Sequence, residues 1–279
     1  MRLNVKSPST PVAENKVRFV CMSDTHSLTS HIKQSIPDGD VFIHAGDFTR
    51  CGSVSEVRDF NAWISKLPHK HKIVIAGNHE LSFDNSFQGL NMETTNCRSE
   101  HLGNSPLHIS QKMLYTPTSA SAEDKEPVNS TATEMQKELT ECTYLEDSGI
   151  VLYGLNIYGT PWQPEFGNWA FNLVRGEQCL QKWNQIPENT DILITHSPPV
   201  GFGDLCSTGI RAGCVDLLNT VQLRVKPKYH VYGHIHEGYG IRSDGQVVYV
   251  NASTCDINYI PCNPPIVFDI NLPAGQTKS

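Results

Sequence analysis

Short apolar runs, each followed directly by a cluster of polar residues, recur along the 279-residue chain. The runs occupy residues 17–22, 41–45, 73–76, 192–194 and 231–232. Runs this short, rich in Val and Ile and bounded by Gly or Pro, are typical of buried parallel strands. In an open α/β sheet, ligands bind in the crevice beyond the carboxyl ends of the strands. We therefore expect the five polar clusters to meet at one site.

Helical periodicity appears between these runs. Residues 53–67 form the clearest predicted helix, with a candidate capping box of Ser53 and Glu56 at its start. Residues 31–36, 176–185 and 213–225 predict further helices, and residues 151–155, 157–160, 247–250 and 266–270 predict further strands. This alternation predicts an α/β fold, a doubly wound sheet with covering helices.

The domain organisation follows from where this periodicity stops. We expect a flexible arm over residues 1–15, one domain over 16–272 and a tail over 273–279. Residues 104–140 are rich in Ser, Thr, Glu and Pro, which predicts a surface insertion, because such a composition buries little apolar surface. Polar clusters lie on both sides of this segment, which favours one interrupted domain over a domain boundary.

Composition and charge narrow the class of partner. Hydrophobic residues make up 38% and charged residues 18%, as in ordinary soluble globular proteins. The net charge of −7, without a Lys/Arg block, argues against a polynucleotide partner but leaves a small phosphorylated substrate open, because a metal supplies local positive charge. No apolar run approaches the roughly 20 residues of a membrane span. Nine irregularly spaced cysteines and the absence of an apolar signal core in residues 1–14 predict a cytoplasmic protein.

The polar clusters contain side chains that bind metals. They are Ser23-Asp24-Thr25-His26, Gly46-Asp47, Gly77-Asn78-His79-Glu80, Thr195-His196 and Gly233-His234-Ile235-His236. A carboxylate has two oxygens, so Asp47 is a natural bridge between two ions. Carboxylate and imidazole ligands without a thiolate suit Mn²⁺, Fe or Zn²⁺. A single Asp after a strand is usually a turn or cap residue, but five such clusters in this order indicate a metal site.

Together, the five clusters resemble the motif set of the calcineurin-like metallophosphoesterase superfamily. That set is Asp-x-His, Gly-Asp, Gly-Asn-His-(Glu/Asp), a lone His and Gly-His-x-His, and it extends here over about residues 17–270. The stretches HAGDFT, KIVIAGNHE, YGTPWQP, DILITH, GHIHEGYG, YVNAS and NPPIVFDI are similar to the subfamily of metallophosphoesterase domain-containing proteins.

The resemblance implies a fold and a set of roles. The fold would be a four-layer α/β sandwich of two mixed sheets flanked by helices, with a dimetal site at the carboxyl ends of the strands. Two divalent ions, Mn²⁺ foremost and Fe or Zn²⁺ as alternatives, would activate a bridging hydroxide for in-line attack on phosphorus. Asp47 would bridge the ions, and His79 would assist the leaving oxygen. The remaining ligands would be Asp24, His26 and His236 on one ion and Asn78, His196 and His234 on the other.

The substrate class is suggested by departures from the Ser/Thr phosphatases of this superfamily. Those enzymes carry an Arg where this chain has Cys51, and a second Arg where it has Ala76, while Arg50 is displaced by one position. Paired arginines suit a dianionic monoester. Their absence favours a phosphodiesterase for nucleotide-type diesters such as cyclic nucleotides. A nucleotide-binding sensor or scaffold of low activity, and a phosphomonoesterase or protein phosphatase, remain the alternatives. Protein partners are unknown, and a protein-interaction role of the 104–140 insertion is compatible with either an enzyme or a scaffold.

Three further residues are candidates for substrate contacts. Trp162 lies in an aromatic-rich stretch that also holds Phe166, Trp169 and Phe171, and such a ring can stack on a base. A packed aromatic corner is the alternative interpretation. Arg175 and Arg211 lie in predicted loops and are candidates to touch phosphate, with solvated charge as the alternative. We expect His44 to be a buried structural residue and His69 to lie on the surface.

Overall fold

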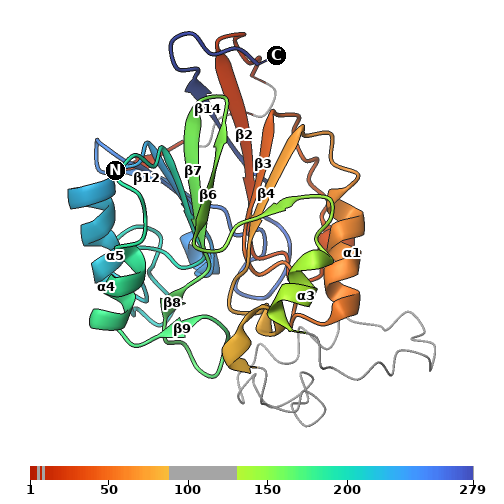
Figure 1. Cartoon of the computed structure of the whole chain (residues 1–279), viewed down its shortest axis with the longest axis vertical. Helices are drawn as coiled ribbons and strands as arrows, with labels where there is room; N and C mark the ends of the chain where they lie inside the picture. The colour runs from red at the N-terminus through yellow and green to blue at the C-terminus, as the bar shows by residue number, and fades with distance from the viewer. Residues whose placement is uncertain (5–6, 8–9, 88–130, 279) are drawn as a thin grey trace.

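Two mixed β-sheets packed face to face form the centre of the molecule in the computed structural model, and helices cover both outer faces (Figure 1). The structure describes residues 1–4, 7, 10–87 and 131–278. The predicted insertion at 104–140 therefore lies outside the described residues up to residue 130. Its last ten residues are described, and they include a short helix.

The first sheet has five strands in the order β14-β2-β3-β4-β5. Four of them run parallel, and the edge strand β14 runs antiparallel to β2. The strands are β2 (Lys16–Met22), β3 (Val41–Ala45), β4 (His71–Ile75), β5 (Thr143–Tyr144) and β14 (Ile266–Asn271). In β2, Phe19 and Cys21 pack between the sheets while Val20 and Met22 pack toward the helices, so both faces are buried. This explains why the first runs are continuously apolar.

The second sheet has seven strands in the order β1-β12-β13-β11-β10-β7-β6. Its four inner strands from β13 to β7 run parallel, and antiparallel strands close both sides. The strands are β1 (Arg2–Leu3), β6 (Ser148–Leu152), β7 (Leu155–Thr160), β10 (Ile192–Thr195), β11 (Tyr229–Tyr232), β12 (Gly240–Ser243) and β13 (Val248–Asn251).

Two details of this sheet differ from the expectation. The sequence predicted strands over residues 151–155 and 157–160 with a turn between them, near Leu155-Asn156, but the turn before β7 lies at Tyr153-Gly154, where both residues have positive φ. Strand β1 lies within the stretch expected to be a loose arm, where Arg2 and Leu3 pair with β12.

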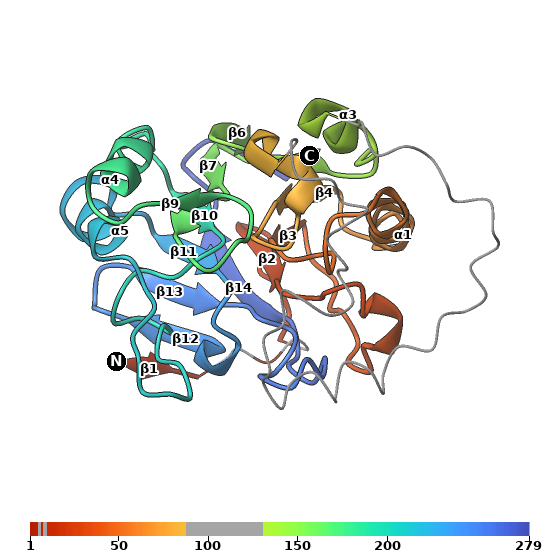
Figure 2. The ribbon, with the colours of Figure 1, turned by 90° about the horizontal axis from the view of Figure 1, so that it is seen from below.

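The helices cover the sheets from outside, as Figure 2 shows with α4 and α5 beyond one sheet and α1 beyond the other. They are α1 (Val54–Ile64), α3 (Ala132–Lys137), α4 (Glu177–Trp183) and α5 (Val215–Asn219), which continues as the π-helical turn η4 (Thr220–Val225). The capping box at the start of α1 is confirmed, because Ser53 Oγ accepts from the Glu56 amide and the Glu56 side chain accepts from the Ser53 amide.

Short elements complete the described part of the chain. They are η1 (Thr29–His31), η2 (Leu81–Phe83), η3 (Asn85–Phe87), η5 (His236–Gly238), β8 (Gln163–Pro164) and β9 (Asn172–Leu173). The helix predicted at residues 31–36 is wrong, because only the single turn η1 forms in this region. The turn signal Pro37-Asp38-Gly39 follows too closely to leave room for a longer helix.

Three apolar layers separate the sheets and helices. The central layer lies between the two sheets, a second holds Phe60 and Ile64 of α1 against the five-stranded sheet, and a third holds Trp183 of α4 against the seven-stranded sheet. The four-layer α/β arrangement is therefore confirmed, and it refines the doubly wound expectation. No helix among the described residues has the length and apolar character needed to cross a membrane.

Candidate dimetal centre

All the predicted metal ligands follow parallel strands of the two sheets. Asp24 and His26 follow β2, Asp47 follows β3, Asn78 follows β4, His196 follows β10, and His234 and His236 follow β11. The two sheets thus contribute to one site from opposite sides. Five of these side chains are buried, and those of His234 and His236 are partly buried.

The backbone turns sharply at several of these residues. Asp24, His26, Asp47 and His234 have φ values of 52°, 44°, 55° and 65°. This left-handed region is uncommon for residues other than glycine, although Asp and His are enriched there. The left-handed turns are stabilised by hydrogen bonds between loops, such as the Asp24 amide to the Gly46 carbonyl and the His26 amide to the Asp47 carbonyl, both 3.0 Å. Backbone strain of this kind is typical of functional sites.

Close packing explains the glycines that precede the ligands. A Cβ atom on Gly77 would overlap Asp47 Oδ1, and one on Gly233 would overlap Asp24 Oδ2. The Gly-Asn-His and Gly-His-x-His motifs therefore need glycine because carboxylates of the site lie directly against their backbone.

Glu80 joins the loops that carry Asp47 and Asn78. Its carboxylate accepts hydrogen bonds from the backbone amides of Asp47 (2.9 Å), Thr49 (2.8 Å) and Gly77 (2.6 Å), and from the Thr49 hydroxyl (2.8 Å). The side chain is fully buried. Glu80 is thus a scaffold for the site, a role that the sequence motif alone did not assign.

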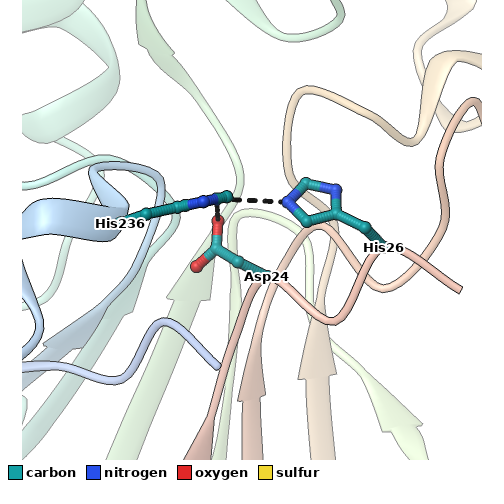
Figure 3. Close-up of side chains that lie close together, drawn as sticks. All are labelled: Asp24, His26 and His236. Carbon is teal, nitrogen blue, oxygen red and sulfur yellow. Dashed lines mark hydrogen bonds and ion pairs between the residues drawn. The ribbon is translucent and has the colours of Figure 1, made fainter. Parts of the chain in front are cut away.

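One group of donor atoms comes from Asp24, His26 and His236 (Figure 3). His236 Nε2 lies 3.4 Å from Asp24 Oδ1 and 3.2 Å from His26 Nε2. His236 Nδ1 lies 2.9 Å from the carbonyl oxygen of Asp256. Because that carbonyl only accepts, Nδ1 carries a proton, and in the neutral ring Nε2 presents a lone pair to the other two side chains. These are the first three ligands that the sequence predicted to share one ion.

A second group comes from Asp47, His196 and His234, with Asn78 beside them. His196 Nε2 lies 3.3 Å from Asp47 Oδ2 and 3.0 Å from Asn78 Oδ1. His196 Nδ1 donates to the carbonyl of Ala45 at 2.9 Å, so in the neutral ring Nε2 presents a lone pair. That lone pair faces oxygen lone pairs, an arrangement that needs a cation or a proton between them. The donor set therefore fits a divalent metal ion.

The pKa shifts of Asp47 and His196 also indicate a site for a cation. Burial raises the pKa of Asp47, but His196 and His79 outweigh it, so this pKa stays well below its usual range. Burial lowers the pKa of His196, but the Asp47 carboxylate more than compensates and raises this pKa to about 9. Without metal, His196 thus carries the proton between the oxygens. A divalent cation would take that proton's place.

Asp47 is central to both groups. His26, Asp47 and His79 form a third set of donor atoms that lie within 4.8 Å of one another, as in the other two sets. Asp47 Oδ2 lies 3.3 Å from His196 Nε2 and 4.0 Å from both His26 Nε2 and His79 Nε2. This position agrees with the predicted bridging role, because candidate ligands of both ions surround the same carboxylate.

The three residues predicted to contact the substrate form hydrogen bonds or ion pairs within the protein. Trp162 Nε1 donates to Asp147 at 2.9 Å, and Lys182 Nζ lies 4.2 Å from the centre of the Trp162 ring. Arg175 donates to the carbonyls of Ala212 and Gly213, and Arg211 forms an ion pair with Asp204 at 2.7 Å. These three side chains connect parts of the protein, and their contact with a substrate stays a prediction.

Three other aromatic rings touch the site directly. Trp169 stacks on His79 with ring centres 4.2 Å apart, and Phe166 meets His234 edge-on at 5.4 Å. Tyr259 contacts His26 at 4.9 Å and His236 at 5.2 Å. The aromatic-rich stretch signalled Phe166 and Trp169 in general terms. Tyr259 had no local signal, because only the tertiary fold brings it to the ligands.

Two other histidines test the expectations about burial. His44 is fully buried and its Nε2 lies 3.0 Å from the Thr25 hydroxyl, which confirms a structural role. The surface placement of His69 is wrong, because its side chain is only 3% exposed. It packs on Phe42, and its Nε2 atom bonds to the Pro37 carbonyl.

Comparison with known proteins agrees with the motifs and the fold. A family model described as calcineurin-like phosphoesterase matches residues 17–238. Metallophosphoesterase domain-containing protein 1 of Homo sapiens is 50% identical over 267 residues, which cover 95% of this chain and 74% of that protein. The UPF0046 protein C25E10.12 of Caenorhabditis elegans is 46% identical over 280 residues, which cover 96% of this chain and 86% of that protein. With its strand-end ligands and this match across both sheets, the chain belongs to the calcineurin-like phosphoesterase family.

Proposed function

We propose that this metal-dependent phosphoester hydrolase acts on phosphodiesters, and that its substrates are small nucleotide-type diesters such as cyclic nucleotides. Mn²⁺ is the metal we propose, with Fe or Zn²⁺ as the alternatives. The donor set of carboxylate, amide and imidazole groups supports this choice, because it contains no thiolate that would favour a structural zinc site.

The observation that carries the diester assignment lies at Cys51. Where protein phosphatases of the superfamily have an arginine, the Cys51 amide and thiol both donate to Glu56 Oε2, at 3.3 Å and 3.7 Å. Residue 51 therefore provides no positive charge here, and its side chain bonds to a carboxylate instead. A dianionic monoester loses more from this missing positive charge than a diester, which carries a single negative charge and needs less compensation.

The chain's own residues account for the other parts of the chemistry. Two bound divalent ions would supply Lewis acidity and a water of lowered pKa as nucleophile. Asp47 and the histidines around it would fix the positions of these ions. His79 Nδ1 donates to the Arg50 carbonyl at 2.6 Å, which leaves Nε2 as the atom that exchanges a proton with the leaving oxygen.

The nucleotide part of the proposal rests on the aromatic rings around the site. Phe166 is 54% exposed although its ring edge meets His234. The loop that carries it is fixed, because the Phe166 amide donates to Asn172 Oδ1 at 3.1 Å and the Glu165 amide donates to the Leu173 carbonyl at 2.9 Å. An exposed ring on a fixed loop beside a metal ligand suits a planar base, and such stacking contributes about 1–3 kcal/mol.

Steady-state hydrolysis of matched esters tests the proposal. We would compare bis-p-nitrophenyl phosphate, p-nitrophenyl phosphate, 3′,5′-cyclic AMP and a phosphoserine peptide with Mn²⁺-loaded wild type and Asp47→Asn. We expect the diesters to be hydrolysed at least tenfold faster than the monoester, and Asp47→Asn to lose this activity. A strong preference for the phosphoserine peptide would replace the proposal with a protein phosphatase.

A nucleotide sensor or scaffold is the second candidate function. It would be indicated if the protein bound two metal ions and nucleotides but hydrolysed neither ester class.

The eight described cysteines form no disulfide, which supports our proposal of a cytoplasmic location.

A further inference from the structure

The imidazole of His79 is fixed by contacts on several sides. Its Nδ1 atom donates to the Arg50 carbonyl at 2.6 Å, and the His79 backbone amide donates to Asp47 Oδ1 at 2.9 Å. The indole of Trp169 covers one face, with ring centres 4.2 Å apart and an angle of 29° between the planes. The edge of His26 lies against the ring at 4.6 Å.

These contacts select one orientation of the ring. Because a carbonyl oxygen only accepts, Nδ1 must carry a hydrogen, and Nε2 is left on the side of Asp47 Oδ2, 4.0 Å away. Rotation about χ2 of a histidine is otherwise soft and broad. A nearly parallel indole at stacking distance blocks that rotation, since an imidazole turned out of its plane would collide with it. The hydrogen bond thus fixes the tautomer, and Trp169 fixes the plane.

Trp169 is itself attached to the segment that it supports. The next amide along the chain, that of Ala170, donates to the carbonyl of Asn78 at 3.1 Å, directly before His79. The Phe171 amide donates to Asp84 Oδ2 at 2.7 Å, and the Gln163 amide donates to the Phe171 carbonyl at 3.0 Å. The indole and the imidazole therefore belong to one hydrogen-bonded unit, although 90 residues separate them in sequence.

We propose that Trp169 is a positioning residue that holds the His79 imidazole with Nε2 directed at the leaving oxygen of the substrate. This inference rests on the proposed function, in which His79 exchanges a proton with that oxygen. As the P–O bond breaks, its electron pair stays on the ester oxygen, which takes the proton from Nε2. An oxygen derived from water forms the new bond to phosphorus, and His79 regains a proton from solvent.

Leaving-group dependence separates this role from a merely structural one. Two thymidine 5′-phosphate diesters serve as substrates: the p-nitrophenyl ester, whose acidic phenol needs no proton to leave, and the phenyl ester, whose phenol does. We expect Trp169→Leu to lose about 10- to 100-fold in kcat on the phenyl ester, part of the range that general acids supply, and less than about threefold on the p-nitrophenyl ester. Trp169→Phe, which keeps a ring, should recover most of the loss.

Two controls make the result specific. Phe166→Leu alters a ring of the same loop that contacts His234 and not His79, so its effect should be equal on both esters. In a His79→Ala background, Trp169→Leu should add no further loss on the phenyl ester, because residues that act through one another are not additive. Equal losses on both esters, or additive losses, would overturn the inference.

A readout without turnover separates this inference from the proposed function. Long-range ¹H–¹⁵N spectra of the Zn²⁺-loaded protein report which nitrogen of His79 carries hydrogen. We expect a single species with hydrogen held on Nδ1, and Nε2 as the nitrogen that exchanges its proton, in wild type and Trp169→Phe, and a mixture or exchange broadening in Trp169→Leu. An unchanged single form in Trp169→Leu would overturn the role of Trp169. Absence of diester hydrolysis with these spectral changes present would overturn only the proposed function.

Discussion

His230 Nε2 lies 2.8 Å from the hydroxyl oxygen of Thr195, the residue directly before the candidate ligand His196. The single hydroxyl hydrogen of Thr195 goes to the Ser197 carbonyl at 2.8 Å, so His230 is the donor in this pair. His44 lies against Thr25 in the other sheet in the same way, at 3.0 Å. Each sheet thus has one buried histidine beside a threonine that adjoins a candidate metal ligand.

These two histidines predict the acid sensitivity of the fold. Burial lowers the pKa of His230 and of His44 to about 3, so both are neutral in the folded protein. Below pH 6.5 the unfolded chain binds protons that the folded chain does not, and stability is therefore lost as the pH falls toward 3. In metal-free protein we expect His230→Phe to reduce the slope of unfolding free energy against pH by ~1.4 kcal/mol per pH unit.

Urea denaturation between pH 4 and 6 measures this slope. His44→Phe should have the same effect on the slope, and the double variant should show the sum. A wild-type slope that neither substitution changes would show that these histidines become protonated in the folded state.

Metal affinity should fall as the pH falls, because protons compete with the metal ion for the same imidazole nitrogens. The pKa of His196 is raised to about 9 because the Asp47 carboxylate outweighs burial, so below pH 9 this imidazole must release a proton when a cation binds. Burial lowers the pKa of His236, but its bond to Asp24 more than compensates and raises it, which adds a second released proton. We expect the Kd for Zn²⁺ to weaken by at least about tenfold for each pH unit between 8 and 6.

Calorimetry in buffers of different ionisation enthalpy counts the released protons directly. The variant His196→Asn should release fewer protons than wild type. Metal affinity that is constant over this pH range would contradict the assignment of His196 as a ligand.

A single methyl group at Gly77 should remove the metal site. Its Cβ would overlap Asp47 Oδ1 and lie 2.6 Å from His196 Cε1, so Gly77→Ala displaces two candidate ligands. We expect the variant to fold but to bind fewer than two metal ions, as measured by elemental analysis after dialysis. Gly245→Ala is the control. It also adds a methyl group, and position 245 has a strained φ of +97°, but no atom lies near the added Cβ. Two ions bound by Gly77→Ala would be the contrary result.

Glu80→Gln should destabilise the protein more than an exposed charge substitution does. The amide NH₂ group of Gln cannot accept hydrogen bonds, so at least one of the buried amides of Asp47, Thr49 and Gly77 loses its partner. Each unsatisfied buried group costs about 1–3 kcal/mol. Glu138→Gln, which removes an exposed ion pair with Arg58, should change stability by less than about 1 kcal/mol. Guanidinium denaturation compares the two variants, and equal effects would argue against the scaffold role.

Local patterns in the sequence predicted most of what is local in the structure. The strands before Asp24 and Asp47 and the capping box at Ser53 agree with the predictions, because short apolar runs and cap residues act over a few positions. The clustering of the ligands was also foreseeable, since parallel strands end at the same edge of a sheet.

Contacts made by tertiary packing were not foreseeable. The approach of Tyr259 to His26 joins residues from opposite ends of the chain, and no periodicity records it. The burial of His69 depends on Phe42 and the Pro37 carbonyl, which lie about 30 residues earlier. Arg175 bonds to backbone carbonyls because the loop after β9 meets the segment before α5, a meeting that depends on the order of strands in the sheet.

The division of the ligands between the two sheets has a consequence for the timing of metal uptake in the cell. His236 is made 212 residues after Asp24. At ordinary rates of synthesis, roughly 10–40 s pass between them. Throughout that interval a nascent chain lacks a complete set of ligands. Full loading with metal therefore has to follow the synthesis of His236, when strands of both sheets have been made.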